Sequence, residues 1–432
     1  MKVMTSREFK GEILNQIVNR GRADFSSVSS SVQKIIEAVR KKGDKAVLRY
    51  TEKFDNVRLP QSRLKVTKKE IKESHRKLKE NQIEALRKAV INIIRFHEEQ
   101  ISDVWSLGVA RGVTVGQITR PLSSVGVYAP GGRASYPSSV LMCTIPARVA
   151  GVKKIVVCSP PRTNGDVNPA LIVAADLAGA TDIYRIGGVQ AIAAMAYGTE
   201  TVPKADKIVG PGNIFVTAAK MQVSRDVAID LPAGPSEILI IADNTASPSI
   251  IASDLLAQAE HDPNAWAILL TASKSLALAV EKEVDAQLEL LSRREIARSS
   301  VQKHGFIVIV RDVKEAVNYA NTIAPEHLEI LTKTPSKVLD GIRNAGSVFL
   351  GQYSPVAFGD YSAGINHVLP TGGYAKTYSG LSTRDFVKTI SFLECNNRGY
   401  LNLKETTVTL AKLEGLDAHA KSVFMRRRKS EG

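Results

Sequence analysis

The chain has 432 residues, of which 44% are hydrophobic and 23% charged, as is ordinary for a globular protein with more than one domain. No uninterrupted apolar run reaches the roughly 20 residues that a membrane-spanning helix needs, and the N-terminus lacks the apolar core of a signal peptide. We therefore expect a cytoplasmic protein that has no membrane partner.

The formal net charge is +15, and most of the excess lies near the N-terminus. Residues 1–120 contain 26 Lys and Arg against 14 Asp and Glu, a net +12, whereas residues 121–240 contain 10 against 8. The basic residues alternate with Glu at helical spacing, which is more typical of a solvated helix face than of a phosphate-binding groove. We therefore expect no nucleic-acid partner, and we expect the basic run from Arg426 to Lys429 to be a frayed end.

Three cysteines at wide spacing form neither a disulfide framework nor a cysteine-rich zinc motif. Cys158 ends an apolar run and is expected to be a buried, unreactive thiol.

Residues 1 to about 105 are predicted to be helical, because apolar side chains such as Ile35, Ile36 and Val39 recur at three- and four-residue steps. From about residue 113, short extended runs alternate with helical stretches. The predicted strands are 125–128, 154–158, 182–185 and 207–209 and, after a Pro-rich turn, 237–242, 267–271 and 305–310. Alternating strands and helices indicate parallel sheets covered on both faces.

The predicted fold is α/β, with two similar Rossmann-like parallel-sheet domains, a helical N-terminal segment and a small helical C-terminal tail domain. The helical N-terminal region is expected to pack with the second α/β domain. The expected boundaries are 1–112 for that N-terminal region, 113–234 for the first α/β domain, 235–373 for the second and 374–432 for the tail.

Four of the seven histidines lie in short polar motifs beside carboxylates or an amide. Histidine binds metals and transfers protons near neutral pH, so these motifs are candidate sites. His75, His97 and His304 lie in charged or surface-like surroundings and are assigned no role. The four motifs are Gln258-Ala259-Glu260-His261, Pro325-Glu326-His327-Leu328, Gly359-Asp360 with Asn366-His367, and Glu414-Gly415-Leu416-Asp417-Ala418-His419.

Gln258 and His261 are three residues apart at the expected C-terminal end of a helix, so their side chains would lie on one side and could share a metal ion. The alternative is a histidine that only favours the helix dipole. Glu326 and His327 are adjacent, so their side chains should diverge and act on different atoms of one substrate. The alternative for this pair is a hydrogen-bonded helix start.

The segment 351–373 is predicted to be a long polar loop, a kind that is commonly functional. In it, Asp360 could supply an oxygen to a metal and His367 could contact an anionic group. Further on, Glu414 is expected to end one helix, and His419 to lie in a new short helix after Gly415.

Two glycine-rich segments follow predicted strands and could bring backbone close to a phosphate or cofactor. They are Pro130-Gly131-Gly132-Arg133 and Gly210-Pro211-Gly212-Asn213. Neither is a G-x-G-x-x-G fingerprint. Residue chemistry and spacing alone thus predict a metal-assisted α/β enzyme without naming its reaction.

Seven motifs in one order carry a resemblance over essentially the whole chain. They are Val127-Tyr128-Ala129-Pro130-Gly131-Gly132, Gly187-Gly188-Val189-Gln190-Ala191-Ile192-Ala193, Gly210-Pro211-Gly212-Asn213, Asp230-Leu231-Pro232-Ala233-Gly234-Pro235-Ser236-Glu237, Gln258-Ala259-Glu260-His261, Pro325-Glu326-His327-Leu328 and Asn366-His367-Val368-Leu369-Pro370-Thr371. In that order they resemble the histidinol dehydrogenase family.

The resemblance implies oxidation of L-histidinol to L-histidine through L-histidinal, with two NAD⁺ and one zinc ion per subunit, as the last step of histidine biosynthesis. It also implies a homodimer with shared active sites, in which Glu414 and His419 act in the partner's site. The zinc ligands would be Gln258, His261, Asp360 and His419, and the acid/base residues Glu326 and His327. Substrate would contact Ser236, Gln258, His261, His327, Asp360, His367, Glu414 and His419, and NAD⁺ would contact Tyr128, Gln190 and Asn213.

Two alternatives stay open at this point. One is a zinc- and NAD-dependent dehydrogenase of the same family acting on another small alcohol, although His367 and Glu414 suit a cationic, imidazole-bearing substrate. The other is a metal-dependent hydrolase, which would need no nicotinamide.

Overall fold

The chain folds into two compact units, described separately here from a computed structural model. The first unit comprises residues 1–100 and 122–386, and the second comprises 101–121 and 387–432. The structure describes residues 1–21, 25–101, 104–131, 135–231 and 234–426, so Gly132, Arg133 and the basic run from Arg427 lie outside the described residues. None of the described helices combines the length and apolar character needed to cross a lipid bilayer.

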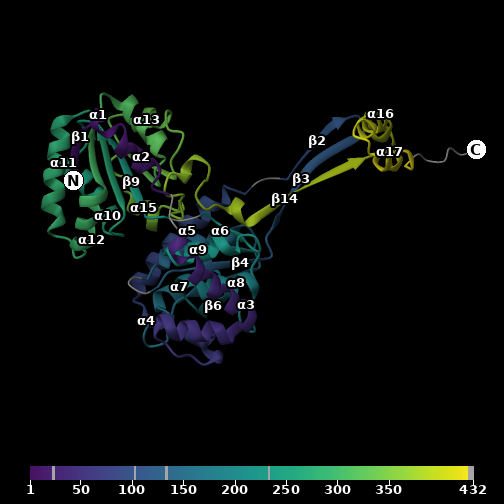
Figure 1. Ribbon diagram of the computed structural model, residues 1–432, viewed down its shortest axis with the longest axis horizontal. Coiled ribbons are helices and arrows are strands. Elements are labelled where there is room, and N and C mark those ends of the chain that lie inside the picture. The colour runs from purple at the N-terminus through teal and green to yellow at the C-terminus, as the bar shows by residue number, and fades with distance from the viewer. Residues whose placement is uncertain (22–24, 102–103, 132–134, 232–233, 427–432) are drawn as a thin grey trace, which may run out of the picture. The chain divides into compact units, whose positions relative to one another are not determined.

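The first unit contains two parallel sheets of the same topology (Figure 1). One has the strand order β6-β5-β4-β7-β8, and the other repeats it as β11-β10-β9-β12-β13 with β1 added at the edge. This is the doubly wound order of Rossmann-like folds, in which the strand order reverses beside the first strand of each sheet. The first sheet consists of β4 (Ser124–Tyr128), β5 (Lys154–Ser159), β6 (Asp182–Arg185), β7 (Lys207–Val209) and β8 (Ala228–Ile229). The second consists of β1 (Lys2–Thr5), β9 (Glu237–Ala242), β10 (Trp266–Thr271), β11 (Gly305–Ile309), β12 (His327–Leu331) and β13 (Ser347–Leu350).

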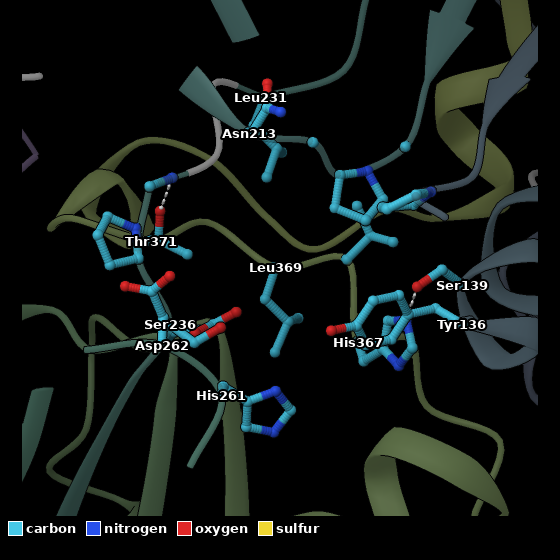
Figure 2. A pocket seen from close by; sticks show the side chains of 18 of the residues that line it. Tyr136, Ser139, Asn213, Leu231, Ser236, His261, Asp262, His367, Leu369 and Thr371 are labelled. Atoms are coloured by element: carbon cyan, nitrogen blue, oxygen red, sulfur yellow. Dashed lines mark hydrogen bonds between the residues drawn. The ribbon is translucent and has the colours of Figure 1, made fainter. Parts of the chain in front are cut away.

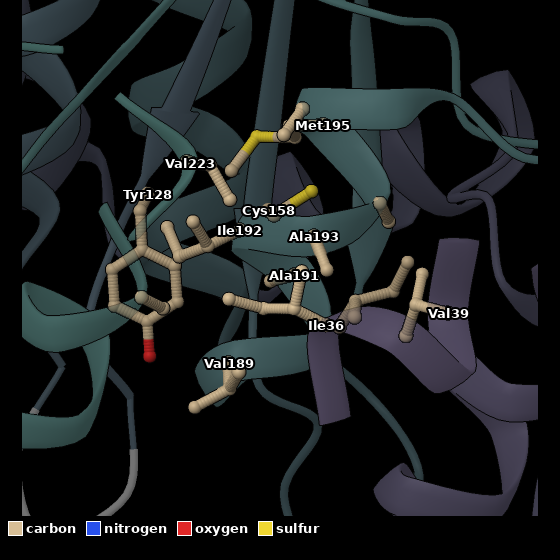
Figure 3. Packing of buried hydrophobic residues seen from close by; sticks show 14 of the residues in the cluster. Ile36, Val39, Tyr128, Cys158, Val189, Ala191, Ile192, Ala193, Met195 and Val223 are labelled. Carbon is tan, nitrogen blue, oxygen red and sulfur yellow. The ribbon is translucent and has the colours of Figure 1, made fainter. Parts of the chain in front are cut away.

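Helices cover both faces of the first sheet, because its strands are apolar on both sides. Val125 and Val127 of β4 pack into one core cluster, whereas Tyr128 packs into the cluster on the opposite face. Figure 3 shows the second of these, where Ile36 and Val39 pack with the apolar side of α8. The helices of this half are α3 (Ser26–Asp55), α4 (Lys68–Lys77), α5 (Glu80–Glu98), α6 (Pro137–Val149), α7 (Pro169–Ala178), α8 (Gly188–Tyr197) and α9 (Ile214–Val223), with a 3-10 turn η1 (Gln61–Arg63).

The second sheet is covered in the same way. All six residues of β9 are buried, as expected for a central parallel strand. The helices α10, α11 and α12 share one core cluster, and α1, α2 and α13 share the other. The elements of this half are α1 (Ser6–Phe9), α2 (Glu12–Val18), α10 (Pro248–Ala259), α11 (Lys274–Leu288), α12 (Arg294–His304), α13 (Val313–Ile323), α14 (Pro335–Leu339), α15 (Val356–Tyr361), η2 (Tyr374–Lys376) and η3 (Thr383–Phe386).

The N-terminal region differs from the expectation in two ways. Its first residues form strand β1, which pairs in parallel with β11, so the region is not wholly helical. Its long helices α3, α4 and α5 pack on the helices of the first sheet, so the prediction that they pack with the second α/β domain is wrong. Only β1, α1 and α2 lie with the second sheet, because the apolar side chains Phe9 and Ile17 fit its core.

The second unit is built on an antiparallel sheet with the order β14-β3-β2. Two helices follow it and pack on each other through Val408, Ala411 and Ala420. A loop followed by a helical tail was expected after residue 373. The two helices agree with this expectation, whereas the long strand β14 was not predicted. The elements are β2 (Trp105–Ala110), β3 (Val113–Pro121), β14 (Val387–Cys395), α16 (Asn397–Leu413) and α17 (Asp417–Phe424).

Candidate active site

A cavity of about 770 Å³ lies in the first unit and is lined by residues from both parallel halves. From the first sheet come the segments after β4 and β7, which include Pro130 and Asn213. From the second come residues at the starts of β9 and β12, such as Ser236 and His327. Doubly wound sheets bind ligands at the carboxyl ends of their strands. The first sheet follows that rule, and the second contributes its amino ends instead.

His327 is the first residue of β12, and its side chain is buried at the cavity wall. Its Nδ1 lies 3.0 Å from the backbone carbonyl oxygen of Glu237. A carbonyl only accepts, so Nδ1 carries the proton and Nε2 carries the lone pair. Among the described residues, Nε2 has no hydrogen-bond partner, although Asp360 Oδ1 lies 3.8 Å away. Burial lowers the pKa of His327 to about 4, so the ring is neutral at pH 7 and can accept a proton.

Glu326 precedes His327 and is also buried. Its Oε2 accepts a hydrogen bond of 2.9 Å from the backbone N–H of Glu237, and burial raises its pKa well above the usual value. The same Oε2 lies 3.5 Å from His327 Nδ1, so the expected divergence of the two side chains is only partial. The alternative of a helix start is wrong, because His327 begins a strand that pairs on both sides.

Gln258 and His261 reach the cavity from the end of α10. The helix ends at Ala259, and a turn hydrogen bond of 3.2 Å from the N–H of His261 to the carbonyl of Gln258 keeps the two residues together. Burial lowers the pKa of His261, which favours the neutral imidazole that metals bind.

Asp360 and His367 come from the segment that was expected to be a loop, and Asp360 lies in the short helix α15. Burial alone raises the pKa of Asp360 to about 7. Its backbone carbonyl oxygen lies 2.9 Å from Nδ1 of His367, whose Nε2 lies 3.3 Å from the hydroxyl of Ser139 (Figure 2). Burial lowers the pKa of His367 to about 4.

Some of these side chains are of the types that bind metal ions. Among the described residues, no three His, Cys, Asp or Glu side chains gather as a ready-made metal site. The cavity does hold an imidazole, an amide and a carboxylate from His261, Gln258 and Asp360. A carboxylate buried without a cation is costly, and a neutral imidazole is a good ligand, so this donor set fits a divalent ion such as zinc.

Glu414 and His419 belong to the second unit. Glu414 caps α16, Gly415 has a φ of +70°, and His419 lies in the short helix α17. The predicted helix stop and new short helix are therefore confirmed.

The three residues expected at the nucleotide site occupy different surroundings. Asn213 lines the cavity and caps α9, where its Oδ1 accepts from the N–H groups of Phe215 and Val216 at 3.1 and 3.2 Å. A helix N-terminus of this kind suits a phosphate. Tyr128 and Gln190 are buried and are not among the described residues that line the cavity. The hydroxyl of Tyr128 accepts a 3.1 Å hydrogen bond from the N–H of Gly188.

Steric contacts explain why the turn before Asn213 contains glycine. Gly210 has a φ of +116°, and a Cβ there would lie 2.1 Å from the carbonyl oxygen of Tyr128. Only glycine therefore lets the ends of β7 and β4 approach this closely at the cavity.

The sequence did not indicate that His97 is buried close to the cavity residue His367. Its expected surface-like setting is wrong, because the side chain is fully buried. Its Nδ1 lies 2.7 Å from Gln100 Oε1, and its Nε2 lies 3.3 Å from Nδ2 of Asn366, the neighbour of His367. The partner Asn366 is 269 residues away in the chain, so no local pattern could reveal the contact.

Two Rossmann-like halves around a cavity that holds a buried, neutral histidine form a framework that suits an oxidoreductase. A family model described as histidinol dehydrogenase matches residues 18–427, and the chain belongs to that family of oxidoreductases of histidine biosynthesis. The resemblance drawn from seven motifs is therefore confirmed.

Relatives and a solved structure agree with this assignment. A histidinol dehydrogenase of Methanothermobacter thermautotrophicus is 52% identical over 98% of this chain and 99% of its own length. One of Methanocaldococcus jannaschii is 46% identical over 99% of both chains. The crystal structure of histidinol dehydrogenase from Elizabethkingia anophelis has a TM-score of 0.93 and 38% identity, covering 99% of this chain and 98% of that one. The predicted α/β fold is thereby confirmed.

Proposed function

We propose that the protein oxidises L-histidinol to L-histidine through L-histidinal with two NAD⁺, the last step of histidine biosynthesis. The observation that carries the proposal is the state of His327, a neutral imidazole with its protonated Nδ1 held by a carbonyl and its free Nε2 at the cavity. Bound NAD⁺ would take up one hydride in each oxidation, and bound zinc would hold the imidazole and amine of the substrate.

In the first oxidation, His327 accepts the hydroxyl proton of the alcohol at Nε2 while hydride leaves the carbon. The product is the aldehyde. The imidazole must be neutral for this step, and its depressed pKa keeps it so at neutral pH.

In the second half of the reaction, Glu326 takes a proton from a water molecule that adds to the aldehyde carbon, while His327 returns its proton to the aldehyde oxygen, which forms the hydrate. His327, neutral again, then removes a hydroxyl proton of the hydrate as the second hydride leaves, and the carboxylic acid that results loses its proton to give the carboxylate. A carboxyl group with a raised pKa exchanges protons nearer to neutral pH than an ordinary glutamate does.

Zinc would be held by Gln258, His261, Asp360 and His419. Ser236 and His367, both at the cavity, would contact substrate together with these ligands and Glu414. Tyr128, Gln190 and Asn213 would contact NAD⁺, and the helix N-terminus at Asn213 supports this side of the cavity as the nucleotide site.

We further propose that the protein is a homodimer in which Glu414 and His419 act in the partner's site. The second unit supports this, because it exposes large apolar side chains that a small unit rarely leaves uncovered. They include Leu107, Leu393, Leu413 and Met425, which are 57%, 63%, 78% and 75% exposed. A cytoplasmic location stays a prediction from the sequence.

One experiment tests the reaction directly. NADH absorbance should rise when histidinol and NAD⁺ are added, with two NADH formed per histidinol consumed, and chelation should stop it until zinc is restored. Competition with simple polyols tests the remaining alternative of another alcohol substrate. No NADH from histidinol with the zinc-loaded protein would overturn the proposal. Family membership argues against the hydrolase alternative, which would consume no NAD⁺.

A further inference from the structure

Arg20 follows helix α2, and its guanidinium is buried at the cavity wall with 3% of the side chain exposed. It forms an ion pair with Glu237, whose side chain is also 3% exposed. Its remaining donors reach backbone carbonyls. These are Ile17 at 2.6 Å, Ile323 at 3.1 Å from both terminal nitrogens, and Ala324 at 3.5 Å.

The carbonyls of Ile323 and Ala324 belong to the short link that leads into Glu326 and His327. Ala324 has a φ of +52°, a left-handed conformation that is strained for a residue with a Cβ. Such a conformation persists where the surrounding structure stabilises it. Arg20, some 300 residues earlier in the chain, stabilises it through its hydrogen bonds to these carbonyl groups.

Glu237, the partner of Arg20, holds both acid/base residues through its backbone. Its N–H donates to Glu326 Oε2 at 2.9 Å, and its carbonyl accepts from His327 Nδ1 at 3.0 Å. Its carboxylate is held in turn, since Oε1 accepts a 2.7 Å hydrogen bond from the N–H of Gly372 while Oε2 pairs with Arg20.

The backbone around the ion pair is packed closely. A Cβ on Gly21 would lie 2.3 Å from the carbonyl oxygen of Gly372, so the two chain segments meet backbone to backbone. The backbone next to Arg20 is therefore held in place, which fixes the position from which its side chain reaches Glu237 and the carbonyl groups.

We propose that Arg20 is a positioning residue for the proton transfers, acting through Glu237 and through the Ile323–Ala324 link on Glu326 and His327. The inference rests on the proposed function of those two residues. Neither Arg20 nor Glu237 needs to touch the substrate for this role. Displacement of the Arg20–Glu237 pair would tilt the His327 ring and make its Nδ1–H tautomer less strongly preferred. Small misplacements of a reacting group lower the reaction rate strongly.

The test uses the zinc-loaded protein with Arg20→Met, which keeps an apolar side chain of similar length. We expect kcat to fall roughly tenfold to a hundredfold with unchanged KM for histidinol and NAD⁺. Added guanidinium ion should restore part of kcat in Arg20→Ala, whose short side chain leaves room for the ion. A raised KM with normal kcat would instead make Arg20 a binding residue, and an unchanged kcat would show that it positions nothing.

Arg185→Met is the matched control. Arg185 is also buried, pairs with Glu70 and donates to two backbone carbonyls, but it is not among the described residues at the cavity. Its loss should lower the melting temperature while kcat stays normal. Equal losses of kcat in both variants would mean that any buried arginine matters equally, which contradicts the proposal.

Two further measurements separate this inference from the proposed function. When Arg20→Met is added to His327→Gln, kcat should fall by a smaller factor than Arg20→Met causes alone, because the part of its effect that acts through His327 is already lost. An additional full loss would overturn the inference. ¹⁵N NMR of the His327 ring needs no turnover. Arg20→Met should convert the Nδ1–H form into a mixture of tautomers, and an unchanged tautomer would overturn the inference even if histidinol proved not to be the substrate.

Discussion

His327 and Glu237 meet through a single hydrogen bond, 3.0 Å from the imidazole Nδ1 to the backbone carbonyl oxygen. Glu237 is held on its other side by Arg20 and by the N–H of Gly372. The base at the cavity is therefore oriented by a backbone group at the start of a core strand, and its tautomer depends on main-chain geometry.

Replacement of His327 by alanine should lower kcat roughly 100- to 10,000-fold, the usual contribution of a general base. Zinc content should be nearly unchanged, because His327 is outside the proposed ligand set. Metal analysis and steady-state NADH formation measure both quantities. His75→Ala is the control, since His75 pairs with Asp176 away from the cavity. A normal rate in His327→Ala would remove the assignment of proton transfer.

Replacement of His261 by alanine should deplete zinc from the purified protein. The imidazole is a proposed ligand on the cavity wall, and an alanine offers no donor atom. Metal content by mass spectrometry before and after dialysis measures the loss. Zinc retained at the wild-type level would exclude His261 from the ligand set.

Mixed dimers test whether active sites are shared. His261→Ala and His419→Ala chains should each be inactive, and a heterodimer of the two should recover part of the activity, since one of its two sites would have both ligands. Differently tagged chains allow the heterodimer to be isolated. No recovery in a confirmed heterodimer counts against sharing.

Lys220 and Asp230 form a buried ion pair at the cavity, on the side proposed to bind the nucleotide, with 3% and 1% of their side chains exposed. The two residues also bond the carbonyl and the N–H of Gly210, at 3.0 and 2.7 Å. Lys220→Met leaves a buried carboxylate without its cation and should cost about 3–5 kcal/mol of unfolding free energy. The KM for NAD⁺ should rise as well.

Urea unfolding and initial rates measure these two effects. The double variant Lys220→Met/Asp230→Asn serves as the control and should recover part of the stability, because the unpaired charge is gone. A single variant as stable as the wild type would contradict the argument.

His97 predicts a pH effect on stability. Burial lowers its pKa below 6.5 in the folded protein. Between 6.5 and that lower value the unfolded chain binds more protons than the folded protein does, so the free energy of unfolding falls as the pH falls. His97→Gln should lower stability at neutral pH, since it disturbs the bonds to Gln100 and Asn366. The same substitution should also make the free energy of unfolding fall less steeply as the pH is lowered.

Urea unfolding at several pH values between about 5 and 7 measures this slope. The rings of His261, His327 and His367, whose pKa values are also lowered, remain in the variant, so the acid dependence should shrink and not vanish. A slope identical to that of the wild type would mean that His97 is not neutral in the folded protein.

Strands β4 to β7 and β9 to β11 were predicted from the sequence because each is a short apolar run between helical stretches. Strand β12, which also lies inside its sheet, was missed, since His327 and Glu329 interrupt its apolar pattern with polar residues that the fold buries. Strand β1 was missed because its partner in the sheet, β11, follows some 300 residues later. Strands β2 and β14 expose most of their residues, so they lack the burial pattern that a sequence can reveal.

The sequence predicted many of the residues that line the cavity, but not the residues that support them from behind. Asn213, Ser236, Gln258, His261, Glu326, His327, Asp360 and His367 were named from motifs, and all of them line one cavity. The supporting residues Arg20 and His97 have no local signature, because their partners are distant in the chain.

The pairing of β1 with β11 also bears on how the chain is made. Lys2 lies opposite Phe306, so strand β1 leaves the ribosome about 300 residues before its partner strand β11. At a synthesis rate of roughly 5–20 residues per second, that is a delay of about 15 to 60 seconds. During this interval the backbone N–H and C=O groups of β1 cannot yet form their hydrogen bonds with β11. A chaperone that binds nascent chains would therefore be expected to bind this segment.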